Sequence, residues 1–293
     1  MRGRFAPSPS GPLHFGSLVA ALASWLDARH ARGQWLVRIE DVDETRTVPG
    51  AADEILRTLE SFGLHWDGAV QWQSRRKAMY EEALDRLRGA GLAYRCRCSR
   101  KEIADSGLRG IEGAVYPGTC RNLQLGTDVA RAERFIVPAG KVEIEDRLQG
   151  TLVQDVAQDV GDFVLKRRDR LHGYQLAVVV DDAEQAITDV VRGADLLQST
   201  PRQVLLQRAL GYAMPRYLHF PVATDAAGEK LSKQTRALAV DASRAPDLIA
   251  AGLAFLGQPA VASRNPVEML EEAAAQWRVG HIPKTLSRRP PGV

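Results

Sequence analysis

The sequence predicts an α/β protein whose doubly wound parallel sheet is split by a β-rich insertion. Short apolar strands alternate with helical segments on both sides of the insertion, a pattern typical of βαβ units. From about residue 95 to residue 165 the pattern changes to cysteines, glycines and short mixed strands. The chain has 293 residues, 45% of them hydrophobic, which suits one large domain or two modest ones.

The first half of the core is expected in residues 1–94. "RFAP" predicts a short strand, followed by a Pro/Gly turn and a helix near Ser17–Arg32. "WLVRIED" predicts a second strand that places Arg38 and Glu40 on one face. Two helices are expected next, in "AADEILRTLESFGL" and in "SRRKAMYEEALDRLRGAGL", the second with Ser74 as a possible cap.

The β-rich module is expected over residues 95–165, with strands in "RFIVPAG", "KVEIEDRLQG" and "DFVLKRRD". The second half of the core, residues 166–240, includes "YQLAVVVDD", whose apolar run predicts a strand buried in a parallel sheet. "AITDVVRGADLL" predicts another strand and turn, and "TPRQVLLQRALG" a helix with Pro201 in its first turn and Gly211 at its end. Residues 241–293 predict helices and a disordered tail, "SRRPPGV".

Charge and hydropathy favour a cytoplasmic protein. The formal net charge of +3 comes from 39 basic and 36 acidic side chains, too small an excess to indicate nucleic acid by itself. The apolar run "LVAALASWL" is too short to span a bilayer, and the Arg- and Pro-rich start does not match a signal peptide. We therefore expect a cytoplasmic monomer with no membrane partner.

The three cysteines, Cys96, Cys98 and Cys120, lie in one short stretch. In a reducing cytosol this indicates a metal site or free thiols rather than disulfides. A C-x-C pair with a distant third cysteine suits tetrahedral zinc, but no histidine between residues 66 and 171 supplies a fourth ligand. Tyr116 is a candidate as a phenolate. The alternative is three reduced thiols beside a core tyrosine.

The stretch "PSPSGPLHFGSL" joins a strand to a helix N-terminus through a Pro/Gly turn. Free backbone N–H groups and the helix dipole make such a junction an anion site. Gly11 and Gly16 would let a nucleotide approach without Cβ clashes, and His14 would donate to a phosphate or ribose. The alternative is an ordinary strand–turn–helix with a surface histidine.

A second motif, "GEKLSKQT", covers Gly228–Thr235. Lys230 and Lys233 flank a serine in a glycine-led loop, and both could clamp a polyphosphate as point charges. The alternative is a solvated basic loop.

Together, in this order and far apart in the chain, the two motifs resemble the HIGH and KMSKS signatures of class I aminoacyl-tRNA synthetases. "RFAPSPSG…LHFGSL", "RIEDVDETR", "AVVVDD", "VVRGADLL…TPRQ" and "KLSKQ" are similar to the glutamyl branch of that class, from about Arg4 to Arg236. Two positions depart from the signatures, because Ser17 replaces the last histidine of the first and Gln234 the last serine of the second. The resemblance implies a Rossmann-type catalytic domain that activates glutamate with ATP.

The chain stops about fifty residues after the second motif, which leaves no room for the helical anticodon-binding domain of a full glutamyl-tRNA synthetase. In this it resembles the glutamyl-queuosine tRNA-Asp synthetase family, a short branch. That family implies activation of glutamate without tRNA, then esterification of the queuosine base in the anticodon loop of tRNA-Asp. It also implies one structural zinc ion, held by Cys96, Cys98, Tyr116 and Cys120.

The resemblance further implies two groups of site residues. Those expected against ATP come from both motifs: His14, Gly16, Ser17 and Lys233. Those expected to act in catalysis, by positioning and by neutralising charge together with Mg²⁺, are His14, Gly16, Lys230 and Lys233. No Ser/His/Asp triad is found, and adenylate formation needs no enzyme nucleophile.

Glutamate brings two carboxylates and an ammonium, and arginine forks suit carboxylates. The residues expected around it by resemblance are Arg4, Phe5, Ala6, Pro7, Ser8, Glu40, Tyr174 and Arg192. Arg192 is expected on the side-chain carboxylate, with Glu40 and Tyr174 near the ammonium group. In the plainer alternative, Arg192 pairs with Asp195 and Glu40 pairs with Arg38.

A tRNA partner requires basic residues along one face. The candidates are Arg75, Arg76, Lys77, Lys166, Arg167, Arg168 and Arg170. Three other functions stay open: a truncated ordinary glutamyl-tRNA synthetase that charges a tRNA 3′ end, a non-catalytic zinc module that binds nucleic acid, and a nucleotidylyltransferase.

Overall fold

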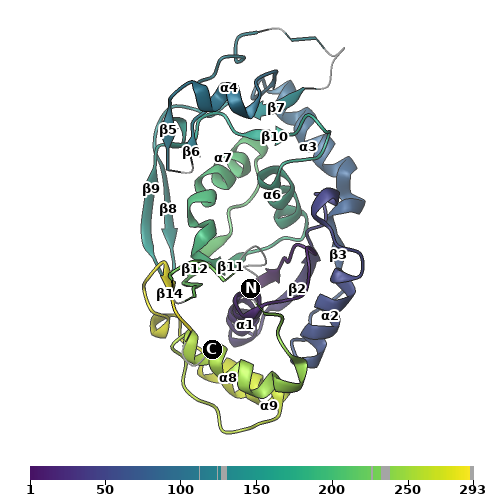
Figure 1. Ribbon diagram of the computed structural model, residues 1–293, viewed down its shortest axis with the longest axis vertical. Helices are drawn as coiled ribbons and strands as arrows, with labels where there is room; N and C mark the ends of the chain where they lie inside the picture. Colours follow the sequence, from purple (N-terminus) through teal and green to yellow (C-terminus); the bar gives the residue numbers. More distant parts are fainter. Residues whose placement is uncertain (112, 124, 127–130, 226, 232–237, 291–293) are drawn as a thin grey trace.

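The computed structural model describes residues 1–111, 113–123, 125–126, 131–225, 227–231 and 238–290. Helices alternate with parallel strands on both sides of a segment rich in antiparallel strands, as the sequence predicts (Figure 1). No helix within these ranges combines the length and the apolar character needed to cross a membrane.

The first part of the core is a parallel sheet in the order β1-β2-β3, with helices on its connections. Its elements are β1 (Arg2–Phe5), α1 (Phe15–His30), β2 (Gln34–Ile39), η1 (Glu44–Arg46), α2 (Ala51–Ser61), β3 (Gln71–Trp72), η2 (Gln73–Arg76) and α3 (Lys77–Gly89). The expected strands and helices of this part are confirmed.

The middle of the chain consists mainly of short strands. The strands and short helices of this segment are β4 (Ala93–Cys96), α4 (Arg100–Asp105), β5 (Arg109–Gly110), β6 (Gly113–Ala114), β7 (Ala132–Phe135), β8 (Val142–Asp146), β9 (Gly150–Gln154), α5 (Val156–Asp159) and β10 (Val164–Lys166). β4 and β10 flank β7 in one antiparallel sheet. β8 pairs antiparallel with β9 and parallel with β12 (Arg216–Phe220) of the second half, so Asp146 lies in the same sheet as that later strand. The four-part division of the chain stays a prediction.

The second half builds a four-stranded sheet in the order β11-β12-β8-β9. Its elements are α6 (Tyr174–Glu184), β11 (Asp189–Gly193), η3 (Ala194–Ser199), α7 (Thr200–Leu210), β12 (Arg216–Phe220) and β13 (Val222–Ala223). The remaining elements are η4 (Ala242–Arg244), α8 (Ala245–Phe255), α9 (Pro266–Gln276), η5 (Val279–His281) and β14 (Ser287–Arg288). Thr188 N donates to Arg2 O at 2.9 Å, which joins the start of β11 to β1.

The core forms around α1, which lies between the strands and the C-terminal helices α8 and α9 (Figure 1). Leu18, Leu22 and Leu26 are fully buried on it. A second cluster joins α3, α6 and α7 to the other sheet. Burial on both sides holds the N-terminus of α1 rigidly at the edge of the sheet, where the site lies.

One expected strand is wrong. "YQLAVVVDD" forms the helix α6, and its residues from Gln175 to Asp182 are buried on every side. A short apolar run in a fully buried helix has no polar face, so its pattern cannot be distinguished from that of a buried strand. The helix turns Asp181 and Asp182 inward, where both meet arginines.

Two smaller expectations are also wrong. Ser74 does not cap α3; it lies in η2, where its Oγ donates to Asp41 Oδ2 at 2.6 Å. The expected disordered tail includes β14, which pairs with β13, and Arg288 Nη1 donates to Phe255 O at 2.7 Å. Backbone pairing therefore orders the tail as far as these residues, and residues 291–293 lie outside the described part. The expected Pro201 and Gly211 at the two ends of α7 are confirmed.

Candidate active site

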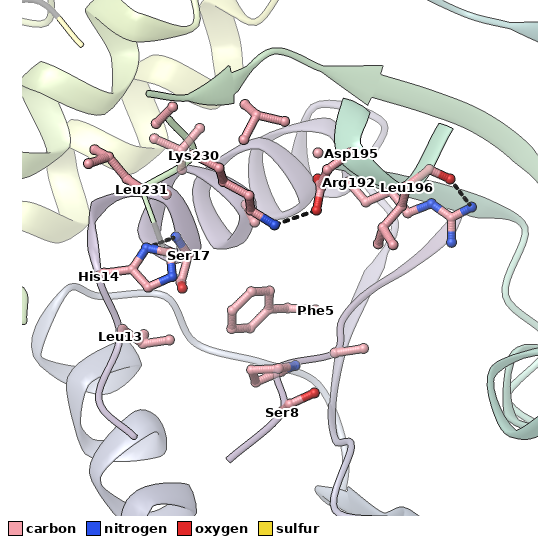
Figure 2. Close-up of a pocket in the computed structure, with 18 of the residues that line it drawn as sticks. Phe5, Ser8, Leu13, His14, Ser17, Arg192, Asp195, Leu196, Lys230 and Leu231 are labelled. Carbon is pink, nitrogen blue, oxygen red and sulfur yellow. Dashed lines mark hydrogen bonds and ion pairs between the residues drawn. The ribbon is translucent and has the colours of Figure 1, made fainter. Parts of the chain in front are cut away.

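A pocket of about 570 Å³ opens where β1 and β11 end and α1 begins (Figure 2). In open α/β sheets, ligands bind at this carboxyl edge. The residues predicted from the sequence that line it are Arg4, Phe5, Ala6, Pro7, Ser8, His14, Gly16, Ser17, Glu40, Tyr174, Arg192 and Lys230. Lys233 lies outside the described residues.

The first motif sets the N-terminus of α1 against this pocket. His14 is the N-cap of the helix, and its Nδ1 accepts a hydrogen bond from Ser17 N at 3.3 Å. A Cβ on Gly16 would lie 3.2 Å from the His14 ring and 3.4 Å from Leu231 O. The tightest of these contacts is with the His14 ring of the same motif, and Leu231 O of the second motif lies at ordinary contact distance.

The second motif reaches the pocket from the other side. Leu231 N donates to Ala223 O at 2.8 Å, and Lys230 Nζ lies 2.5 Å from Asp195 Oδ2 (Figure 2). The Arg192 nitrogens donate to His219, Leu196 and Thr200, and among the described residues no ion pair joins Arg192 to Asp195 as the plainer alternative required. The two lysine- and histidine-bearing stretches, far apart in sequence, lie side by side.

Arg192 is a buried cation beside the pocket. Its side chain, 5% exposed, extends from β11. Nε donates to His219 Nε2 at 2.9 Å and Nη2 donates to Thr200 Oγ1 at 2.8 Å. Nη1 is buried and has no hydrogen-bond partner among the residues that the structure describes. A buried guanidinium with an unused donor suits an anionic ligand, because an unmade hydrogen bond to a charged group is unfavourable.

Arg4 and Glu40 belong to a buried charge cluster centred on Asp182. Arg4 Nε and Nη2 donate to the two oxygens of Asp182 at 3.1 and 3.2 Å. Arg38 pairs with Asp182 at 2.8 Å and with Glu40 at 3.3 Å, as the alternative for Glu40 foresaw. Burial raises the pKa of Glu40, and Arg38 opposes the rise. Burial and the nearby Glu40 carboxylate also raise the pKa of Tyr174, which stays a neutral phenol in this wall of the pocket.

The cysteines gather as a metal site requires. The sulfur atoms of Cys96, Cys98 and Cys120 all lie within 4.8 Å of one another. Cys98 Sγ is 3.6 Å from Cys120 Sγ, and Tyr116 Oη is 3.3 Å from Cys96 Sγ and 3.9 Å from Cys98 Sγ. Zn–S bonds of about 2.3 Å in a tetrahedron separate the ligand atoms by roughly 3.8 Å. The four side chains therefore fit one tetrahedral ion.

Tyr116 is held with its oxygen toward the sulfurs. Cys120 N donates to Tyr116 Oη at 2.8 Å, and the guanidinium of Arg134 lies 3.9 Å from the centre of the Tyr116 ring. Burial raises the pKa of Tyr116, and burial with the Cys120 contact raises the pKa of Cys98 to about 11. As free side chains both stay protonated, so a metal ion is what would make them anionic ligands.

Several candidate tRNA-binding residues are already engaged within the protein. Ion pairs join Arg76 to Asp181, Lys77 to Glu44, Lys166 to Glu81 and Arg167 to Asp43. Arg168 and Arg170 are exposed on the turn after β10. The charge free to attract RNA from this group is therefore smaller than the sequence indicates.

Sequence reasoning missed the residues that support the pocket from behind. Asp182, Thr200 and His219 contact Arg4 or Arg192 but were not singled out. A lone histidine in the apolar strand "RYLHF" and an aspartate doublet after an apolar run were the available signals, since buried polar residues require partners.

Comparisons with known proteins agree with this geometry. Residues 1–271 match the family described as tRNA synthetases class I (E and Q), catalytic domain. The chain is 58% identical over 288 residues to the glutamyl-Q tRNA(Asp) synthetase of Dechloromonas aromatica, covering 97% of this chain and 96% of the relative. With that of Chromobacterium violaceum it shares 54% over 283 residues, covering 96% and 95%.

The chain belongs to the glutamyl-Q tRNA(Asp) synthetase family of class I tRNA synthetases. This confirms the resemblance found in the sequence. The fold is also that of a crystal structure of glutamate-tRNA synthetase from Elizabethkingia anophelis, with a TM-score of 0.82 at 24% identity, over 100% of this chain and 68% of that one. The predicted class I catalytic fold of this family is thus confirmed.

Proposed function

We propose that this chain joins L-glutamate to queuosine in tRNA-Asp in two steps. An oxygen of the glutamate α-carboxylate attacks the α-phosphorus of ATP, and pyrophosphate leaves without any tRNA bound. A hydroxyl of the queuosine base, at the first anticodon position, then attacks the carbonyl of glutamyl-adenylate, and AMP leaves. The names of relatives that are more than 50% identical over nearly the whole chain support this reaction.

The observation that carries the proposal is the meeting of two ligand sites in one pocket. The α1 N-terminus and Lys230 form a side suited to phosphates, and Arg192 forms a side suited to a carboxylate. Placed between them, the glutamate carboxylate and the α-phosphate would be held for in-line attack. Positioning and charge neutralisation then supply the catalysis.

Each predicted residue takes a role in this scheme. On the ATP side, His14, Gly16, Ser17 and Lys233 bind the nucleotide, and Lys230 neutralises charge with Mg²⁺. On the other side, Arg192 takes the glutamate side-chain carboxylate, while Glu40 and Tyr174 face the ammonium group. Arg4 and the backbone as far as Ser8 complete the wall, and the Asp182 fork fixes how Arg4 is oriented.

We assign zinc a structural role. Cys96, Cys98, Tyr116 and Cys120 would hold it, and four protein ligands leave no open position for a substrate. Its chemistry when bound is to tie β4 to the segment that follows α4. We expect the chain to act as a monomer in the cytoplasm, where ATP and tRNA are both present.

The deciding experiment offers labelled glutamate and ATP to alternative acceptors. A queuosine-bearing tRNA-Asp anticodon hairpin should be labelled, and the same hairpin with guanosine in place of queuosine should not. Label only on full-length tRNA-Glu would instead identify an ordinary glutamyl-tRNA synthetase. Absence of glutamate-dependent ATP–pyrophosphate exchange would favour the non-catalytic zinc module.

A further inference from the structure

We infer that Asp146 and His219 are positioning residues for glutamate: they orient the Arg192 guanidinium so that one nitrogen remains for the glutamate side chain. The inference deepens the proposed function and rests on it. It assigns a role to a buried polar chain that runs behind the pocket, from β8 through β12 to β11.

The first step concerns the state of His219. Asp146 Oδ2 lies 2.7 Å from His219 Nδ1, and Asp146 Oδ1 accepts hydrogen bonds from the backbone N–H groups of Leu148 and Gln149. An ionised carboxylate only accepts, so Nδ1 carries the proton and donates it to Asp146. Burial lowers the pKa of His219 to about 4, against the effect of Asp146. The ring is therefore neutral, and Nε2 presents a lone pair.

The neutral His219 ring and Thr200 orient the Arg192 guanidinium through hydrogen bonds. The Nε2 lone pair of His219 accepts from Arg192 Nε at 2.9 Å, while Thr200 Oγ1 accepts from Nη2 at 2.8 Å. The guanidinium carbon lies 5.6 Å from the centre of the Tyr217 ring. Contacts at two nitrogens and one face determine the plane of a rigid fork.

One donor of the Arg192 guanidinium, Nη1, remains unused. Nη1 is the one Arg192 nitrogen with no hydrogen-bond partner within the described ranges. A histidine with its proton on Nε2, or a protonated ring, would point a donor at a donor and turn the guanidinium away. The Asp146–His219 pair prevents this, so Arg192 keeps its place with one unused donor. An arginine ordered in advance loses less entropy when the carboxylate binds.

Two substitutions of the same histidine separate positioning from simple core filling. In H219Q the longer amide can present its oxygen near the place of Nε2, so Arg192 Nε keeps an acceptor while Asp146 Oδ2 loses its donor. In H219N the shorter amide can still donate to Asp146 but cannot reach Arg192. A structural role predicts that Asn is the better substitute, whereas positioning predicts that Gln is.

The measurement is glutamate-dependent ATP–pyrophosphate exchange, with KM determined separately for glutamate and ATP. We expect H219N to raise the glutamate KM about tenfold to a hundredfold and H219Q about threefold, with little change in the ATP KM. H30N is the matched control: it makes the same kind of substitution at the C-terminal end of α1, away from the pocket, where the His30 ring contacts Ala274 O at 2.8 Å. Its glutamate KM should equal that of the wild type.

Thermal melting checks that each variant is folded, and T200V tests the second anchor if H219N fails to fold. T200V removes the nearer of the two acceptors of Arg192 Nη2, leaving Leu196 O at 3.5 Å, and should also raise the glutamate KM. An unchanged glutamate KM in H219N or T200V, or a larger effect of H219Q than of H219N, would overturn the inference alone. Wild-type protein without any glutamate-dependent exchange would overturn the proposed function and this inference with it.

Discussion

Arg192→Ala is the substitution that most directly tests how the pocket recognises glutamate. The side chain is 5% exposed, and its Nη1 has no hydrogen-bond partner in the part of the chain that the structure describes. Without it, the glutamate side-chain carboxylate would enter the pocket unpaired. Removing one partner of a buried ion pair costs about 3–5 kcal/mol. At about 1.4 kcal/mol per factor of ten, this cost corresponds to a fall of about 100- to 4,000-fold in kcat/KM for glutamate. Because water can enter the open pocket, we expect the lower part of this range, about 100- to 1,000-fold.

The assay is ATP–pyrophosphate exchange with glutamate and ATP varied in turn. The KM for ATP should change by about twofold or less, because the role proposed for Arg192 is to recognise the amino acid. Glutamine has no charge on its side chain, so kcat/KM for glutamine should fall less than kcat/KM for glutamate. The ratio of the two values, which measures the preference for glutamate, should therefore decrease. Arg147→Ala is the control, since it breaks a bidentate pair with Asp27 at 2.6 and 2.9 Å outside the pocket. Equal losses for glutamate and ATP in Arg192→Ala, or no loss at all, would refute the reasoning.

Three other predictions follow from the same contacts. Lys230→Ala removes the cation that pairs with Asp195, and single-turnover adenylate formation should slow about tenfold to a hundredfold at unchanged melting temperature; an unchanged rate contradicts its role. Cys98→Ser should lower zinc content, by mass spectrometry, below the one equivalent expected for wild-type protein, and fully folded wild-type protein without metal would exclude the site. Burial opposes ionisation of Glu81, but hydrogen bonds from Lys166 and His172 outweigh it and lower its pKa from 4.5 to about 2. The ionised Glu81 carboxylate therefore stabilises the folded protein. This stabilisation is complete above the ordinary pKa of 4.5 and is lost as the pH falls toward 2. The Glu81→Gln variant should therefore lose less stability than the wild type on acidification. The same loss of stability on acidification in the two proteins, measured by denaturation at each pH, would contradict this prediction.

Most secondary structure and both ends of the pocket could be predicted because their signals are local. Gly211 ends α7 in the left-handed conformation, and Pro201 lies in its first turn, as their backbone preferences require. The α6 helix could not be predicted in the same way. Its burial on every side removes the polar face by which a helix is usually recognised.

The candidate site divides along the same line. His14, Gly16 and Lys230, which line the pocket, were singled out because the two motifs place fixed residue types at fixed local spacing. The fork from Arg4 to Asp182 spans 178 positions, and the bond from Arg192 to His219 spans 27. No local pattern encodes which distant acceptor a buried arginine will meet.

The sequence by itself determined the α/β class, the two motifs, the cysteine cluster and the family resemblance, because each is written in residue types and their spacing. Only the tertiary structure decided that Leu231 lies beside Gly16, that Asp182 holds Arg4, and that Arg192 Nη1 stays unused while Nε donates to His219. The physical reason is that buried polar groups must find partners wherever packing brings them, and packing is a property of the whole chain.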